Sequence, residues 1–192
     1  MSLNIGMSFQ LQEAVLPNGL YRVYGEAIHP MRTFHPNEYP AVRVYLEEEL
    51  VKAAESLTGK PFVMDHKTAL PSPNKVTSCW WDATRQTVAY EGEVEPYVAR
   101  WIREGDIKGV SIELDWAIPG GSIAYVDGFA AKGFKFTGLT LVRTLEPGDK
   151  EAFIKLREAV IMNKPLPEEE KPAPLEKSSL TLRQKIKKRA GI

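Results

Sequence analysis

Apolar and polar residues alternate at every second position in several segments, which is the spacing of a strand with one buried face. The alternation is clearest in Lys75–Trp81 and Thr87–Glu95, and it predicts two strands that pair around the turn at 82–86. It is weaker in Ser8–Leu16 and Leu20–Ile28, but the intervening Asn-Gly dipeptide is a strong hairpin signal. These segments therefore predict two pairs of neighbouring strands.

Four further segments have the composition of short strands, because each is apolar or alternating and bounded by turn-forming residues. They are Pro61–Lys67, Lys108–Asp115, Ser122–Val126 and Lys132–Val142. Three other segments place apolar residues three or four positions apart, which predicts amphipathic helices. They are Ala41–Leu57, Pro96–Ile107 and a segment that begins at Glu146 and runs to about Met162. The acidic run Glu47–Glu49 in the first helix is expected to form a solvated face.

The composition changes after Asn163, which divides the chain into a domain at 1–162 and a tail. Lys164–Pro174 holds four prolines and three consecutive glutamates, so 163–178 is predicted to be a linker. Residues 179–192 predict a short basic amphipathic helix. This helix either binds an acidic surface of a partner or forms a solvated tail.

The overall composition indicates which classes of protein this chain can belong to. A chain of 192 residues with a 43% hydrophobic fraction can bury the core of one domain. Its 25 basic and 25 acidic residues balance, so no net field favours direct nucleic-acid binding. The single cysteine, Cys79, excludes an intrachain disulfide and is expected to be a buried apolar filler. No apolar run approaches the ~20 residues that span a bilayer, so no membrane association is expected.

One candidate for chemistry is Ser111, in the predicted strand Lys108–Asp115. Ser111, Glu113 and Asp115 would share the polar face of that strand, and Gly109 leaves the serine open to attack a carbonyl. The alternative is a surface strand whose polar face begins with a serine.

The other candidate is a histidine. His29 and His35 fall in a proline-containing segment and are expected to be exposed loop residues. His66 is attached to the end of a predicted strand, next to Asp65. The alternative for His66 is a strand-end residue bonded to backbone.

Three segments together resemble the prohead maturation proteases of tailed viruses. Leu57–His66 (LTGKPFVMDH) is similar to their histidine segment, and Ile107–Glu113 (IKGVSIE) is similar to their serine segment. Phe136–Val142 (FTGLTLV), followed by Glu-Pro-Gly at 146–148, resembles the strand and turn that close their core. The resemblance covers about residues 10 to 160 and depends on the order and spacing of the three motifs.

The resemblance implies a herpesvirus-assemblin-like α+β fold, with a closed, antiparallel-rich β-barrel surrounded by helices. It implies a serine endopeptidase that cleaves scaffold and capsid proteins inside the immature shell, in the host cytoplasm. Ser111 matches the nucleophile and His66 the base. Such an enzyme needs no metal or organic cofactor, and its relatives often form homodimers.

The chemistry requires more than these two residues. A neutral imidazole must take the serine proton and return it to the leaving amine, and backbone N–H groups must stabilise the oxyanion. Gly109 and Gly138 are the candidates for close backbone approach to the oxyanion. The alignment also places Gly138 where the family commonly has a third, histidine-orienting residue.

Glu113 is the candidate to replace that third residue, because it lies on the face of Ser111 at ~7 Å along a strand. Asp115, at ~13 Å, is too far away, and Asp65 is expected to point away from His66. Three explanations stay open: the alignment is shifted, the site is a Ser-His dyad, or cleavage has been lost.

Three interpretations follow for the whole chain. The first is a serine endopeptidase of capsid maturation. The second is a non-catalytic, capsid-associated or scaffold-like protein on the same fold. The third is a small β-rich binding domain without a viral connection.

Overall fold

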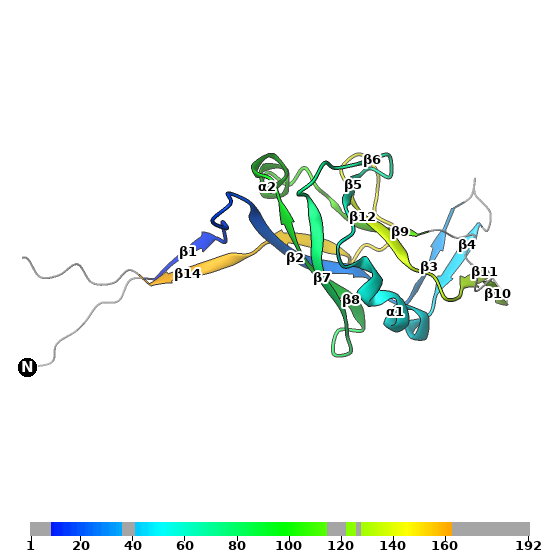
Figure 1. Ribbon diagram of the computed structural model, residues 1–192. Helices are drawn as coiled ribbons and strands as arrows, with labels where there is room; N and C mark the ends of the chain where they lie inside the picture. The colour runs from blue at the N-terminus through cyan, green and yellow to red at the C-terminus, as the bar shows by residue number, and fades with distance from the viewer. Residues whose placement is uncertain (1–8, 36–40, 115–121, 126–127, 163–192) are drawn as a thin grey trace, which may run out of the picture. The chain divides into compact units, whose positions relative to one another are not determined.

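The computed structural model describes residues 9–35, 41–114, 122–125 and 128–162 (Figure 1). Residues 11–160 form one compact unit, and a second unit combines residues 1–10 with 161–192. The predicted linker at 163–178 and the predicted basic helix at 179–192 lie outside the described residues. The three four-stranded sheets belong to the unit at 11–160.

Strands dominate the described chain, and they form three four-stranded sheets and one two-stranded sheet. Within the described ranges each sheet has a linear strand order, so no sheet closes on itself. The α-helices there are short, at Glu47–Ala53 (α1) and Pro96–Arg103 (α2), and they do not surround a barrel. The expectation of a closed β-barrel surrounded by helices is therefore wrong.

The first sheet has the order β13-β2-β8-β7, and every neighbouring pair is antiparallel. Its strands are Tyr21–Ile28 (β2), Lys75–Asp82 (β7), Thr87–Val94 (β8) and Phe153–Leu156 (β13). The predicted pairing of β7 with β8 is confirmed. Along β7 the buried Val76 and Cys79 lie among more exposed residues, while most of β8 is buried.

The second sheet has the order β6-β5-β12-β9. Its strands are Phe62–Met64 (β5), Thr68–Ala69 (β6), Gly109–Leu114 (β9) and Phe136–Val142 (β12). β12 pairs in parallel with β5 and antiparallel with β9. This order places the predicted histidine segment and the predicted serine segment on the two sides of β12.

The remaining strands form a third sheet and a two-stranded pair. The third sheet has the order β10-β11-β4-β3, with strands Met31–Phe34 (β3), Val42–Tyr45 (β4), Ser122–Tyr125 (β10) and Gly128–Ala131 (β11). Phe9–Glu13 (β1) pairs with Glu158–Met162 (β14). β3 is an edge strand of its sheet, as β9 is of the second sheet.

Two of the helix predictions need correction. The first predicted helix starts as strand β4, continues as α1 and ends in a 3-10 helix at Ala54–Leu57 (η1). The predicted helix at 146–162 is wrong, because this segment contains β13 and β14. Its apolar residues fit two consecutive strands as well as one helix, and the pairing of β13 with β2 selects the strands. The predicted helix at Pro96–Ile107 is confirmed but shorter, as α2.

The N-terminal hairpin is also only partly correct. The predicted turn forms, with the N–H of Leu16 donating to the carbonyl of Leu20 at 2.8 Å, and Gly19 has φ +80°. A single bridge joins Val15 to Tyr21, but β1 takes β14 as its partner instead of β2. Strand β3 lies inside the segment that was expected to be a loop.

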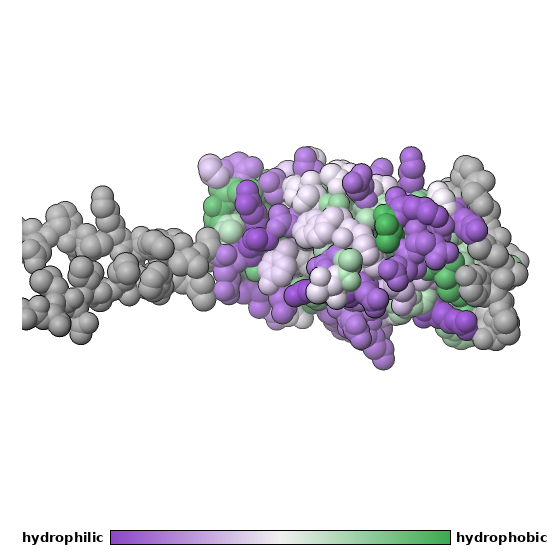
Figure 2. Space-filling view, turned by 90° about the horizontal axis from the view of Figure 1, so that it is seen from below, coloured by the Kyte–Doolittle hydropathy of each residue, from purple (hydrophilic) through white to green (hydrophobic). Residues whose placement is uncertain are grey.

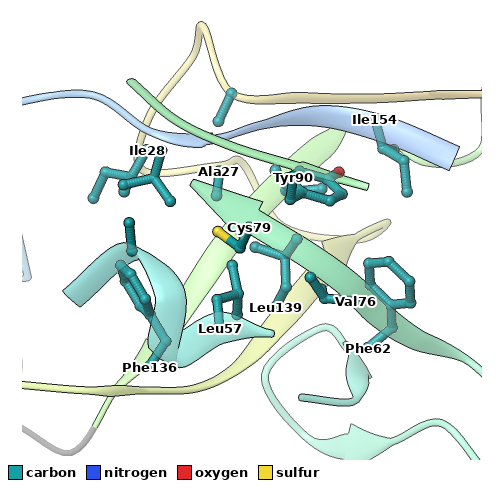
Figure 3. Close-up of a cluster of buried hydrophobic side chains, with 14 of the residues drawn as sticks. Ala27, Ile28, Leu57, Phe62, Val76, Cys79, Tyr90, Phe136, Leu139 and Ile154 are labelled. Atoms are coloured by element: carbon teal, nitrogen blue, oxygen red, sulfur yellow. The ribbon is translucent and has the colours of Figure 1, made fainter. Parts of the chain in front are cut away.

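The core lies between the first and second sheets and the 3-10 helix. Figure 3 shows Leu57, Cys79 and Leu139 close together within it. The prediction that Cys79 fills the core is confirmed, since the residue is buried and its thiol is free. Burial raises the pKa of this thiol to about 12.

The surface of the described residues is mostly hydrophilic on the face shown in Figure 2, with small separate hydrophobic patches. Trp80 is 43% exposed, whereas its neighbour Trp81 packs against the core, as expected for adjacent residues in a strand. Among the described residues, no helix combines the length and the apolar character that a membrane crossing requires.

Candidate active site

The two strands β9 and β12 bring three polar residues onto one face of the second sheet. Ser111 lies directly opposite Thr140, and Glu113 lies opposite Gly138. Residues opposite each other, and residues two apart in a strand, share a face of the sheet. Ser111, Glu113 and Thr140 are therefore neighbours.

His66 reaches this face from the other side of β12. Strand β5 ends at Met64, and Asp65 and His66 follow in a turn closed by the Lys67 N–H, which donates to the Met64 carbonyl at 2.9 Å. Asp65 has φ +46° and His66 has φ +57°. The predicted strand is thus shorter than expected, and His66 is a turn residue.

The imidazole of His66 contacts Glu113 directly. Nδ1 of His66 lies 2.8 Å from Oε1 of Glu113, and the Thr140 hydroxyl donates a hydrogen bond to the same oxygen. The Thr140 hydroxyl is also 3.4 Å from Nδ1 of His66. An ionised carboxylate only accepts hydrogen bonds, so this contact assigns the proton to Nδ1 and leaves Nε2 as an acceptor in the neutral ring.

Glu113 stays ionised in spite of its partial burial. Burial alone raises the pKa of this carboxyl, but the hydrogen bonds from His66 and Thr140 and the charge of His66 outweigh it. The net result is a pKa below the ordinary value of 4.5. Thr140 is fully buried, and its hydroxyl is held by the hydrogen bond to Glu113.

A cavity of about 760 Å³ opens beside these residues. Its lining includes Ser111, His66 and Glu113, the residues of β3, and the segment around Leu145 and Asp149. Within the described ranges the Ser111 hydroxyl makes no hydrogen bond, with His66 or with any other group. Ser111 and His66 thus face the same cavity without being bonded to each other.

The other predicted site residues take different places. A side-chain carbon at Gly109 would lie 3.1 Å from both Ala152 O and Pro147 Cγ, and one at Gly138 would lie 3.0 Å from Val63 Cγ2. A side chain at either position would therefore be tightly packed against its neighbours, and neither glycine lines the cavity. Asp115 lies outside the described residues.

Sequence reasoning missed Thr140. This residue lies on β12, close to the position where the family commonly has the residue that orients the histidine. The alignment placed Gly138 there, and a shift of two positions along the same strand face leads to Thr140. The alternation of β12 shows that the two residues share a face. A threonine in an apolar strand is an ordinary β-former, however, and only its hydrogen bond to Glu113 distinguishes it.

A second polar cluster surrounds His29, which is 16% exposed and therefore not the exposed residue that was expected. Its Nδ1 lies 2.8 Å from Asp149 Oδ2, and its Nε2 lies 3.1 Å from Glu26 Oε2. Arg85 pairs with the other oxygen of Glu26.

His35 is half-buried and contacts the Thr33 hydroxyl at 2.9 Å. No group of three metal-ligating side chains converges within the described residues.

Comparisons with known protein families, with curated proteins and with solved structures give no match. A functional proposal for this chain therefore depends on its own geometry and on the motif resemblance described above.

Proposed function

We propose that this protein is a serine endopeptidase in which Ser111 is the nucleophile, His66 the general base and Glu113 the residue that orients His66. The observation that supports this most strongly is the 2.8 Å contact between Glu113 Oε1 and His66 Nδ1, beside the cavity that Ser111 also lines. The contact leaves Nε2, the other ring nitrogen, as the acceptor for the serine proton.

In this mechanism the Ser111 hydroxyl rotates toward Nε2 of His66 and attacks the carbonyl carbon of the peptide bond. His66 takes the hydroxyl proton as the new C–O bond forms, and Glu113 stabilises the imidazolium. The imidazolium then gives its proton to the leaving amine as the C–N bond breaks. A water molecule, activated by the same nitrogen, hydrolyses the acyl-enzyme and restores the serine.

The lining of the cavity suits a polypeptide substrate. Phe34 and Leu145 line it and are 70% and 45% exposed, and they offer apolar surface beside the reacting groups. Arg32 and Arg43 also line it and add positive charge. A peptide segment carries both apolar and charged side chains, which a lining of this kind could contact.

The motif resemblance supports a narrower biological role. We propose that the substrates are scaffold and capsid proteins of a tailed virus, cleaved inside the prohead in the host cytoplasm, with a homodimer as a form to be tested. The second candidate is a non-catalytic, capsid-associated protein. It is favoured by one observation, namely that the Ser111 hydroxyl is not bonded to His66.

A fluorophosphonate probe separates the two candidates, because it reacts with serines that are activated as nucleophiles. We expect labelling at Ser111, located by peptide mass spectrometry, and loss of labelling in Ser111→Ala and in His66→Ala. Ser78→Ala is the matched control, since Ser78 lies on β7 and does not line the cavity. Absence of labelling in the folded wild-type protein would reject the peptidase and leave the non-catalytic candidate.

A further inference from the structure

We propose that Asp65 is a positioning residue, which holds the backbone of His66 so that the imidazole reaches Glu113. The inference rests on the proposed function, because it assigns Asp65 a part in that reaction. Asp65 does not line the cavity, and its carboxylate binds the segment after β12. It would therefore act through His66 and not on the substrate.

The first step in the argument is the conformation of the turn. Asp65 and His66 both have positive φ, as the central residues of a type I′ turn do. Such turns favour Asn-Gly, Asp-Gly or Gly-Gly, so Asp65 suits the first central position, whereas the second is usually glycine because a side chain in the left-handed region crowds the backbone. Two consecutive residues other than glycine therefore need support from the surrounding structure.

Asp65 supplies that support with its own atoms. Its Oδ1 accepts the backbone N–H groups of Arg143 at 2.7 Å and Thr144 at 3.0 Å. Its Oδ2 accepts the Thr144 hydroxyl at 2.9 Å, and its N–H donates to the Leu141 carbonyl at 3.1 Å. Four hydrogen bonds thus tie the turn to the end of β12.

The anchor on β12 is also the support of Glu113. Thr140, which donates to Glu113, directly precedes Leu141 in the strand. The same strand end therefore fixes the imidazole through Asp65 and the carboxylate through Thr140. Arg143 is held in turn by its ion pair with Asp106 at 2.8 Å and by the ring of Trp101, 5.1 Å from its guanidinium.

The charge of Asp65 suits this role. Burial raises the pKa of the carboxyl, but the backbone N–H groups of Arg143 and Thr144 and the Thr144 hydroxyl outweigh it. The pKa is consequently below its ordinary value of 3.8, and the acceptor remains ionised at neutral pH.

Asp65→Ala and Asp65→Asn form the informative pair of variants. Alanine removes every side-chain acceptor, whereas asparagine keeps an oxygen for the two backbone N–H groups. We expect Asp65→Ala to lower kcat, or the rate of fluorophosphonate labelling, by about 10²-fold through misplacement of the base, with KM little changed. Asp65→Asn should restore most of that loss.

Asp82→Ala is the matched control. Asp82 Oδ1 also accepts two backbone N–H groups, from Thr84 at 2.9 Å and Arg85 at 3.1 Å, in a turn whose aspartate does not line the cavity. We expect this variant to keep the wild-type kcat. An equal loss of kcat in Asp82→Ala and Asp65→Ala would show a general stability effect and overturn the inference.

A readout independent of activity is the ¹⁵N spectrum of His66, which reports the tautomer and the hydrogen bond at Nδ1. We expect the Nδ1 signal of Asp65→Ala to shift in the direction that Glu113→Gln shifts it. An unchanged His66 spectrum in folded Asp65→Ala overturns the inference. If Asp65→Ala does not fold, Thr144→Ala, which removes one donor, is expected to give a smaller shift, and no shift overturns the inference.

The two proposals fail in different ways. A wild-type protein that is never labelled at Ser111 rejects the peptidase, whatever the spectra show. A labelled wild type with an unaltered His66 in folded Asp65→Ala keeps the peptidase and rejects the positioning role.

Discussion

Nδ1 of His66 lies 2.8 Å from Oε1 of Glu113, although 47 positions separate the two residues in sequence. The contact exists because β12 pairs with β5 on one side and with β9 on the other. Because Nδ1 is engaged with Glu113, the contact leaves Nε2 as the hydrogen-bond acceptor of the neutral ring.

Glu113→Gln should lower kcat by up to about 10⁴-fold, the loss expected when the carboxylate that orients a catalytic histidine becomes an amide, while the protein stays folded. The amide carries no charge, so it cannot stabilise the imidazolium that forms during attack. Steady-state kinetics on a peptide substrate measure the effect, with Glu93→Gln on β8 as control. Equal kcat values for Glu113→Gln and the wild type would exclude Glu113 from the mechanism.

Thr140→Val replaces a buried hydroxyl by a methyl group of similar size. Loss of the hydrogen bond to Glu113 removes one of the effects that keep its pKa low, so that pKa should rise. Hydrogen bonds to charged groups contribute about 1.5–3 kcal/mol, which corresponds to a decrease in kcat of about tenfold or more.

Thr87→Val is the control for this substitution, because Thr87 is equally buried and its hydroxyl donates to the Ile28 carbonyl. It should reduce stability without changing kcat of the folded enzyme. Should both threonine variants lose only stability, Thr140 would have no part in supporting Glu113.

Phe34→Ala and Leu145→Ala should raise KM for substrates that carry bulky apolar side chains and leave kcat nearly unchanged. Both residues are exposed and line the cavity, and burying a large apolar side chain contributes about 1.5–3 kcal/mol. Comparison of a leucine-containing peptide with its alanine counterpart isolates the effect. Val51→Ala is the control, since Val51 is 44% exposed but does not line the cavity; a matching rise in KM there would contradict the prediction.

Glu49 allows a test of stability against pH away from the site. It is buried, contrary to the solvated face expected for the acidic run, and it accepts the Gly133 N–H at 2.7 Å and Lys52 Nζ at 2.7 Å. The Gly133 N–H and Lys52 hold its pKa below the ordinary value of 4.5. The unfolded state therefore binds more protons in acid, and the stabilisation, complete above pH 4.5, is lost as the pH falls through the folded value.

Urea unfolding at pH 7 and pH 3 measures this. Glu49→Ala should reduce the free energy of unfolding at pH 7 by about 2 kcal/mol and show a weaker loss on acidification. The neighbouring exposed Glu48 gives the control Glu48→Ala, which should behave like the wild type at both pH values. A wild-type pH dependence in Glu49→Ala would show that the contact with Gly133 contributes nothing.

Local patterns predicted the elements whose own residues determine them. The alternation of β7 and β8, and Pro96 at the start of α2, required no knowledge of distant partners. The helix predicted over β13 is wrong because the partner of this strand, β2, lies far away in sequence. The closed barrel implied by the resemblance is wrong because the described sheets keep open edges. Whether a sheet closes depends on its edge strands, which short-range periodicity does not specify.

The residues of the candidate site could be predicted in part from the sequence. Ser111 and His66 follow from the motifs, and the shared strand face identifies Glu113 as a candidate. What the sequence could not show was the turn at Asp65, which lets His66 reach across β12 to Glu113. Thr140 needed the register between β9 and β12 before its role could be recognised.

The left-handed turn has a practical consequence for the choice of an inactive variant. His66→Gly would remove the proposed base and, at the same residue, relieve the steric crowding of a side chain at φ +57°. The relief of backbone strain in the folded state would stabilise the protein. It would offset the destabilisation caused by the greater conformational entropy that glycine gives the unfolded chain. We therefore expect the inactive His66→Gly variant to stay folded. Such a variant could retain bound polypeptides that the active form would cleave and release.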